Sequence, residues 1–259
     1  MDRRLQAAER IARAAGALLH QMLGTHMQVR AKDVRSNLVT EADTRSEALI
    51  RQMIAEQFPD DAVLGEEGGT SAGSGTGRWI VDPLDGTTNF AHGYRCFCVS
   101  IAYELEGSIL VGAVFDPMAD EMYLAERGAG ATCNGSRLAA SPVGDIRDAL
   151  LVTGFPPLPT SGEIPNLRTM ERFMRRGQAV RRDGSAALDL CYVAAGRFDA
   201  FWEAGLHAWD IAAGALIVAE SGGRVSDYAG KPLRLDCGEL LATNGLVHDS
   251  MVEVLSERP

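Results

Sequence analysis

The stretch from Arg78 to Phe90 constrains the fold of this chain more than any other. It reads Arg-Trp-Ile-Val-Asp-Pro-Leu-Asp-Gly-Thr-Thr-Asn-Phe, so an apolar run is followed by two carboxylates, a glycine and two hydroxyls. The apolar run favours a β-strand. Because proline has no N–H to donate, Pro83 predicts the end of regular pairing. We therefore predict a strand that stops at Asp82 and continues as a rigid loop.

The loop has the composition of a magnesium and phosphate site. Asp82 and Asp85 bring two hard oxygen ligands close together, as Mg²⁺ prefers, and water and phosphate complete its coordination. Gly86 allows a close approach of the backbone, and a helix that begins near Thr87 would direct N–H groups at an anion. Because carboxylates repel an anion, the pattern indicates a cation between them.

Composition and charge narrow the class of protein. The 259 residues are 46% hydrophobic and 23% charged, as in an ordinary globular protein, and no long linker divides them. We expect a single domain over residues 1–259. A net charge of −10 argues against direct binding of nucleic acid, which needs clustered positive charge.

Cysteine usage and hydropathy predict the compartment. The five cysteines are odd in number and lack paired zinc spacing, which favours a reducing environment over a secreted disulfide scaffold. The longest apolar run, 211–219, is too short to span a bilayer. We expect a soluble cytoplasmic protein with no membrane partner.

Helical and strand patterns are mixed along the chain without clean βαβ alternation, so we predict an α/β (α+β mixed) layered fold. Residues 70–77 are predicted to be a mobile surface loop, and Asn134-Gly135 is a hairpin signal. Helices are predicted at 3–23, 40–58, 166–176, 186–195, 209–221 and 247–256. Strands are predicted at 62–64, 79–82, 97–105, 109–115, 121–125, 149–153, 178–181, 198–203, 224–227 and 239–243.

Further acids stand at element ends, at Gly65-Glu66-Glu67 and Trp209-Asp210, where they could converge on one sheet edge. Each has a simpler interpretation. Asp210 could be a helix-capping acid, and one of the two glutamates is expected to be solvated.

Other polar positions also have a simpler interpretation. Thr40-x-x-Asp43 is a capping pattern that could also serve catalysis. Lys32 is predicted to be a surface charge, and Glu203 could be an exposed strand-end acid. The chain has no Walker A loop and no His-Glu-x-x-His, which excludes P-loop nucleotidases and zinc proteases.

Residues 79–90, together with Trp209-Asp-Ile-Ala-Ala-Gly214, resemble the two signatures of the inositol monophosphatase family. Glu66, Asp43 and Gly184-Ser185-Ala186 fall where that family has counterparts. The resemblance covers nearly the whole chain. It implies a layered α-β-α-β-α sandwich of the inositol monophosphatase and fructose bisphosphatase type, with Mg²⁺ as cofactor. It also implies a metal-site half at the N-terminus and a substrate half at the C-terminus.

The resemblance also implies roles for individual residues. One Mg²⁺ would be bound by Glu66, Asp82 and the carbonyl of Leu84, and a second by Asp82, Asp85 and Asp210. Glu66, with Asp43 and Thr87, would be catalytic, the latter two by positioning and deprotonating the attacking water. Gly86 and Thr87 would bind the phosphate group of the substrate. The alcohol part would be bound by Gly184, Ser185, Glu203 and Asp210.

We therefore expect a Mg²⁺-dependent phosphomonoesterase that acts on a small phosphorylated polyol, sugar or amino-alcohol, nominally inositol 1-phosphate. Histidinol-phosphate phosphatase and fructose-1,6-bisphosphatase are the alternatives, since fold and metal site do not fix the alcohol. A protein that binds the transcription machinery is the alternative from another class, because some bacterial relatives act there. The resemblance also implies a homodimer.

Overall fold

The helices follow the amphipathic and apolar stretches of the sequence. The protein is represented by a computed structural model that describes residues 2–25, 29–32, 38–156 and 166–257. In this part of the chain the α-helices are α1 (Arg3–Met22), α2 (Glu41–Gln57), α3 (Thr87–Ala91), α4 (Leu167–Arg176), α5 (Ala186–Ala194), α6 (Ala208–Glu220) and α7 (His248–Ser256). Every predicted helix is confirmed, and so is the short helix that begins at Thr87.

The strands form two large sheets and one small one. The larger sheet is, in spatial order, β10 (Ser136–Arg137), β9 (Gly130–Cys133), β8 (Glu121–Glu126), β7 (Ser108–Asp116), β6 (Cys98–Leu105), β5 (Gly77–Asp85), β3 (Ala62–Gly65) and β4 (Gly69–Ser71). The second sheet is β12 (Ala179–Arg181), β11 (Leu150–Thr153), β13 (Ala200–Ala204), β15 (Glu239–Thr243) and β14 (Arg224–Ser226). A two-stranded sheet pairs β1 (Val29–Ala31) with β2 (Leu38–Thr40).

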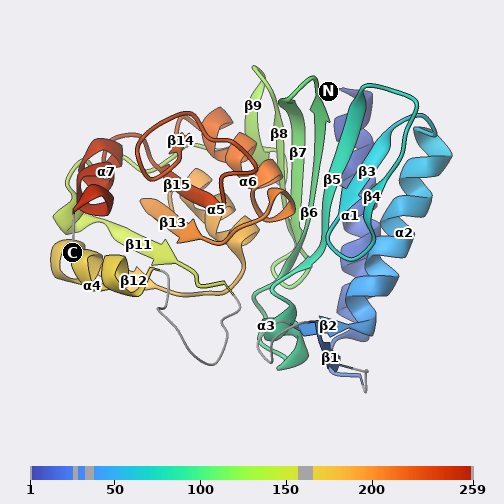
Figure 1. Ribbon diagram of the computed structural model, residues 1–259, viewed down its shortest axis with the longest axis horizontal. Coiled ribbons are helices and arrows are strands. Elements are labelled where there is room, and N and C mark those ends of the chain that lie inside the picture. The colour runs from blue at the N-terminus through green and yellow to red at the C-terminus, as the bar shows by residue number, and fades with distance from the viewer. Residues whose placement is uncertain (1, 26–28, 33–37, 157–165, 258–259) are drawn as a thin grey trace.

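These elements stack as five layers, which confirms the predicted layered α/β fold. Figure 1 shows α1 and α2 on one side of the larger sheet and α5 and α6 on the other, followed by the second sheet and an outer layer of α4 and α7. Apolar side chains of successive layers meet in hydrophobic cores. Trp79 is fully buried in the core under α1 and α2, and Trp202 in the core under α4 and α7. The α5–α6 layer therefore lies between two sheets, which explains why both helices are apolar almost all round.

The predicted antiparallel arrangement in the middle of the chain is confirmed. Strands β6, β7 and β8 pair as successive antiparallel neighbours. Asn134 and Gly135 form the turn between β9 and β10, with φ of 48° and 79°. Positive φ at both central positions is what Asn-Gly hairpin turns require.

Two boundaries differ from the sequence prediction. The loop predicted at 70–77 begins with β4, which pairs antiparallel with β3, so the Gly- and Ser-rich composition does not prevent a short edge strand. Strand β5 does not stop at Asp82 but runs on to Asp85. Asp82 pairs with Ser100 and Asp85 with Cys98, so the strand accommodates Pro83 in a bulge of one extra residue.

Strands β1 and β2 have no counterpart in the sequence prediction. Both are only three residues long, and β1 is exposed throughout, so no alternation of apolar and polar residues marks them. Lys32 nevertheless follows β1 directly, and Thr40 ends β2 and caps α2. Among the described residues, none of the helices combines the length and apolar character needed to cross a bilayer.

Candidate metal centre and active site

The bulge at the end of β5 turns two buried carboxylates towards different neighbours. Asp82 is 2% exposed, and its Oδ1 accepts a hydrogen bond of 3.0 Å from the N–H of Leu84. Asp85 Oδ2 accepts hydrogen bonds of 2.7 Å from Ser185 Oγ and from the N–H of Ala187, at the start of α5. Burial raises the pKa of Asp85 to about 6, although these hydrogen bonds lower it. The N-terminus of α5 thus fixes Asp85 from the opposite half of the chain.

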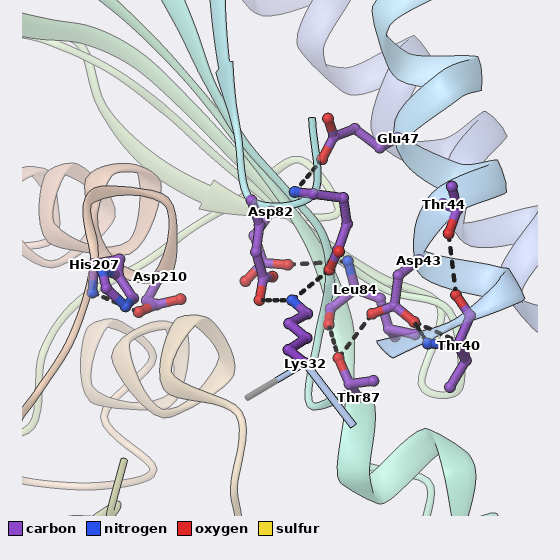
Figure 2. A network of polar contacts seen from close by, with 12 residues as sticks. Lys32, Thr40, Asp43, Thr44, Glu47, Asp82, Leu84, Thr87, His207 and Asp210 are labelled. Atoms are coloured by element: carbon purple, nitrogen blue, oxygen red, sulfur yellow. Dashed lines mark hydrogen bonds and ion pairs between the residues drawn. The ribbon is translucent and has the colours of Figure 1, made fainter. Parts of the chain in front are cut away.

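Asp43 and Thr87 form a direct pair. The Thr87 hydroxyl lies 2.8 Å from Asp43 Oδ1 and 3.1 Å from the carbonyl of Leu84, two acceptors for its proton. Asp43 Oδ2 accepts hydrogen bonds of 2.8 Å and 2.6 Å from the N–H and the hydroxyl of Thr40. The predicted capping role is confirmed, because the bond from the Thr40 N–H to Asp43 is one half of the capping box of α2, and the Thr40 side chain accepts from the backbone N–H of Asp43 in the other half. Figure 2 shows that the same carboxylate also reaches Thr87, so the cap presents a base to the site.

Asp43 is completely buried, and its protonation equilibrium is shifted. Burial raises the pKa of Asp43, the hydrogen bonds from Thr40 and Thr87 lower it, and the charge of Glu66 raises it further. The net direction is upward. A carboxylate with a raised pKa is a better proton acceptor than a solvated aspartate at neutral pH, which suits a general base.

The loop between β3 and β4 carries Glu66 and Glu67, and two side chains hold it. Glu47 of α2 accepts hydrogen bonds from the N–H groups of Glu67 and Gly68, at 2.7 Å and 2.8 Å. Lys32 Nζ lies 2.7 Å from Glu66 Oε1 and 2.5 Å from Glu67 Oε1. Both glutamates are more than three-quarters buried, so the prediction that one would be solvated is wrong.

Lys32 is an exposed residue, as predicted for a surface charge, but it is also paired with the acidic site. Its side chain is 22% exposed and lies against both glutamates. Burial lowers the pKa of Lys32, but the charges and hydrogen bonds of Glu66 and Glu67 outweigh this and raise it. The lysine therefore stays protonated and supplies a positive charge at the edge of the acidic site.

Asp210 comes from α6, in the layer between the two sheets. It lies in the first turn of this helix and accepts a hydrogen bond of 2.6 Å from the N–H of His207, so its predicted capping role is confirmed. The His207 ring stacks on Trp209, with centroids 4.8 Å apart. Burial raises the pKa of Asp210, and the charges of Asp85 and Glu66 raise it further. The helix start thus directs a carboxylate at the end of β5.

The four acids of the predicted metal site act on one another. Burial and the charges of Glu66, Asp85 and Asp210 all raise the pKa of Asp82. In their present orientations no three histidine, cysteine, aspartate or glutamate side chains of the described residues form a complete metal cluster. The carboxylates are instead directed at Lys32 and at backbone N–H groups.

The donor set nonetheless fits Mg²⁺. It offers hard oxygen atoms, Asp82 and Asp85 are buried while Glu66 and Asp210 are partly buried, and their mutual repulsion is of the kind that a divalent cation compensates. Glu66, Asp82, Asp85 and Asp210 carry four potential negative charges, and Lys32 opposes them with one positive charge. A bound cation would therefore relieve an electrostatic cost that the fold itself creates.

Gly86 and α3 occupy the position predicted for phosphate binding. Gly86 has φ of +96°, in the left-handed region that favours glycine. A Cβ atom there would lie 2.8 Å from the carbonyl oxygen of Cys96. Helix α3 begins at the next residue, so the tight turn brings backbone N–H groups next to Asp85.

The residues predicted for the alcohol lie in the second half of the chain, and their environments differ. Glu203 is 7% exposed on β13, so it is not an exposed strand-end acid. Burial raises the pKa of Glu203, and the charges of Asp210 and Asp85 raise it further. Ser185 is buried with its hydroxyl directed at Asp85, and Gly184 has φ of +85° in the turn before α5.

Sequence reasoning missed two further polar residues. The sequence prediction gives Glu47 no role beyond the helix, although its spacing of four residues before Arg51 is an ion-pair signal. Asp189 of α5 is 1% exposed, and neither carboxylate oxygen has a hydrogen-bond partner among the residues that the structure describes. Burial and the charges of Asp183, Glu203 and Asp85 raise the pKa of Asp189. An acid inside an apolar helix was the available signal for it.

Comparison with known proteins identifies relatives along the full length. A sequence model of the inositol monophosphatase family matches residues 1–258. The Nus factor SuhB of Pseudomonas aeruginosa is 45% identical over 253 residues, which cover 94% of this chain and 92% of that protein. The inositol-1-monophosphatase of a Synechocystis species is 41% identical over 263 residues, covering 98% and 89%.

Solved structures confirm the fold. The extragenic suppressor protein suhB of Bartonella henselae superposes with a TM-score of 0.94 at 36% identity, and each chain is covered completely. An inositol monophosphatase/NADP phosphatase complexed with Mg²⁺ and phosphate has a TM-score of 0.83 at 26% identity, with 99% and 97% of the two chains covered. The site described above therefore lies in a fold of which one solved structure contains Mg²⁺ and phosphate.

Proposed function

Because the chain belongs to the inositol monophosphatase family, we propose that it is a Mg²⁺-dependent phosphomonoesterase whose principal substrate is inositol 1-phosphate. The observation that carries the proposal is the contact between Asp43 and Thr87 next to four mutually repelling acids. Phosphoryl transfer requires positioning and charge neutralisation above all, and this arrangement offers both.

The metal site in this proposal uses Glu66, Asp82, the carbonyl of Leu84, Asp85 and Asp210. Bound Mg²⁺ would lower the pKa of water and neutralise charge on the phosphate and the leaving oxygen. The protein keeps the donors in place: Ser185 and Ala187 hold Asp85, and the Leu84 N–H holds Asp82. Glu47 holds the loop that carries Glu66.

The proton of the attacking water leaves through Thr87 and Asp43. The Thr87 oxygen accepts a hydrogen bond from the water when its own proton is directed at Asp43 Oδ1, 2.8 Å away. Asp43 then takes up the proton, which its raised pKa favours. The N–H groups of Gly86 and Thr87 hold the phosphate oxygens, and Glu203 and Asp210 accept hydrogen bonds from the alcohol.

A panel assay tests this function. Purified protein is assayed with inositol 1-phosphate, histidinol phosphate and fructose 1,6-bisphosphate, with and without Mg²⁺. We expect Mg²⁺-dependent hydrolysis, fastest with inositol 1-phosphate. Asp210→Asn should abolish turnover with the fold intact, whereas Asp249→Asn, an exposed acid on α7, is the matched control and should not. Metal-independent activity, or full activity of Asp210→Asn, would refute the metal assignment.

A second role is suggested by the relative of highest identity reported above, which is named Nus factor SuhB. We expect the phosphatase to have an additional contact with the transcription machinery. A pull-down with RNA polymerase tests it, and an absence of binding at micromolar protein would rule it out.

A homodimer and a cytoplasmic location remain predictions. Light scattering checks the former, with a monomer mass as the contradicting result.

A further inference from the structure

The carboxylate of Glu203 lies in space that Gly154 leaves empty. Strands β11 and β13 are parallel, and Thr153 pairs with Trp202, so Gly154 follows on the strand next to Glu203. A Cβ atom built on Gly154 would be 2.0 Å from Glu203 Oε2 and 2.5 Å from its Cδ. No carbon atom tolerates such contacts, so a side chain at position 154 and the present position of Glu203 exclude each other.

Among the described residues, the Glu203 carboxylate makes the nearest steric demand for glycine at position 154. The φ of Gly154 does not fall in the left-handed region, so its backbone is compatible with alanine. The three nearest atoms to the added Cβ all belong to the Glu203 carboxylate. A substitution at 154 therefore acts on this carboxylate before it acts on anything else.

Gly154 itself is held in place. Its carbonyl accepts a hydrogen bond of 3.1 Å from Asn166 Nδ2, and Asn166 Oδ1 accepts one of 2.8 Å from the Tyr228 hydroxyl. The preceding Thr153 donates its hydroxyl to the carbonyl of Trp202 at 2.6 Å. Because three segments fix the backbone at 154, an added methyl group would displace the Glu203 side chain and leave the strand where it is.

We propose that Gly154 is a specificity-determining residue: by having no side chain it sets the position of the Glu203 carboxylate, and thereby favours leaving alcohols that donate hydroxyl hydrogen bonds to it. The proposal rests on the proposed function, in which Glu203 meets the alcohol. It predicts that a side chain at position 154 changes the preference for polyol phosphates over phosphate esters without hydroxyl groups. Binding of the phosphate group itself should not change.

Steady-state kinetics of Gly154→Ala with two esters test the proposal. Inositol 1-phosphate has hydroxyls that can bind Glu203, and p-nitrophenyl phosphate has none. We expect the ratio of kcat/KM for the first over the second to fall about tenfold or more, mainly through KM, because one hydrogen bond to a charged group is lost. Gly144→Ala is the control, since nothing lies within 4 Å of a Cβ atom there.

Two further measurements separate displacement of Glu203 from general damage. The double variant Gly154→Ala/Glu203→Ala removes the clash. Its kcat/KM ratio for the two esters should therefore equal that of Glu203→Ala alone, and the effects of the two substitutions on this ratio should not add. A crystal structure of Gly154→Ala should show the Glu203 carboxylate in a different position. This measurement does not depend on the variant being active.

An unchanged ratio in an active Gly154→Ala, additive losses in the double variant, or an unmoved Glu203 would each overturn the proposal. A wild type that hydrolyses neither ester would refute the proposed function, and the specificity role of Gly154 with it. An active wild type with an unchanged ratio in Gly154→Ala would refute the specificity role alone.

Discussion

The variant Glu47→Gln tests how much the hydrogen bonds that hold the Glu66 loop contribute to stability and to Mg²⁺ binding. The Glu47 side chain is 4% exposed and accepts hydrogen bonds from Glu67 N–H, Gly68 N–H and Arg51 Nε at 2.7, 2.8 and 2.6 Å. The introduced amide has one acceptor oxygen, and its NH₂ group faces a donor. Loss of one charge-assisted hydrogen bond and of a helical ion pair should lower the free energy of unfolding by about 2 to 3 kcal/mol. That corresponds to a fall in Tm of about 6 °C.

Glu47→Gln should also weaken the binding of Mg²⁺. Because the loosened loop carries a proposed ligand, the Mg²⁺ concentration for half-maximal activity should rise about tenfold. Activity titrations with Mg²⁺, together with urea unfolding, measure both effects.

The chain contains its own matched control for this variant. Glu41 and Arg45 have the same spacing on the same helix, at 3.4 Å, but both are about half exposed and hold no loop. Glu41→Gln should therefore change stability by no more than about 0.5 kcal/mol and leave the Mg²⁺ requirement unchanged. If Glu47→Gln behaved like Glu41→Gln in both measurements, the positioning role that we derive from its hydrogen bonds would be wrong.

Three other results are expected. Thr87→Val should lower kcat about a hundredfold or more, whereas Thr87→Ser keeps the hydroxyl and most of the activity; equal loss in both would contradict proton transfer through Thr87. Mg²⁺ should raise the Tm of the wild type but not of Asp82→Asn, by differential scanning fluorimetry; an equal rise in both would argue against Asp82 as a ligand. Burial lowers the pKa of His248 to about 4, so the unfolded state takes up its proton first as pH falls below about 6.5. Stability should drop by about 2 kcal/mol between pH 6.5 and 5 relative to His248→Gln, and parallel pH profiles would refute this.

Local patterns were enough to predict most elements of this fold. Helix α1 and the strands of the antiparallel meander have periodic apolar positions, and Asn134-Gly135 carries its own turn preference. Pro83 predicts an end of β5 at Asp82, three residues short of its actual end at Asp85. A bulge allows the strand to continue past a residue without an N–H, since the neighbouring strand skips one pairing there.

The contacts that hold the site could not be predicted in this way. Lys32 is 34 residues from Glu66, and Ser185 is 100 residues from Asp85, so neither contact leaves a local trace in the sequence. Composition makes an isolated lysine look like a surface charge, and only the short strand β1, itself without a pattern, brings Lys32 to the loop. Motif resemblance supplied the acids of the site, but tertiary structure was needed to reveal which side chains hold them.

The location of the acids explains how the site can couple the layers of the molecule. Asp82 belongs to β5 of the larger sheet and Glu66 to the loop between its strands β3 and β4, whereas Asp210 belongs to α6 between the two sheets and Asp85 is bound by the start of α5. Buried like charges destabilise a fold unless something neutralises them. Burial and the charges of Glu66, Asp85 and Asp210 raise the pKa of Asp82, a hydrogen bond from the Leu84 N–H lowers it, and Lys32 pairs with Glu66. A cation bound between these acids would draw the larger sheet and the α5–α6 layer together. Its binding free energy would thus act on the packing of the layers as well as on the phosphate, which is why loss of one ligand should be visible in thermal stability and not in turnover alone.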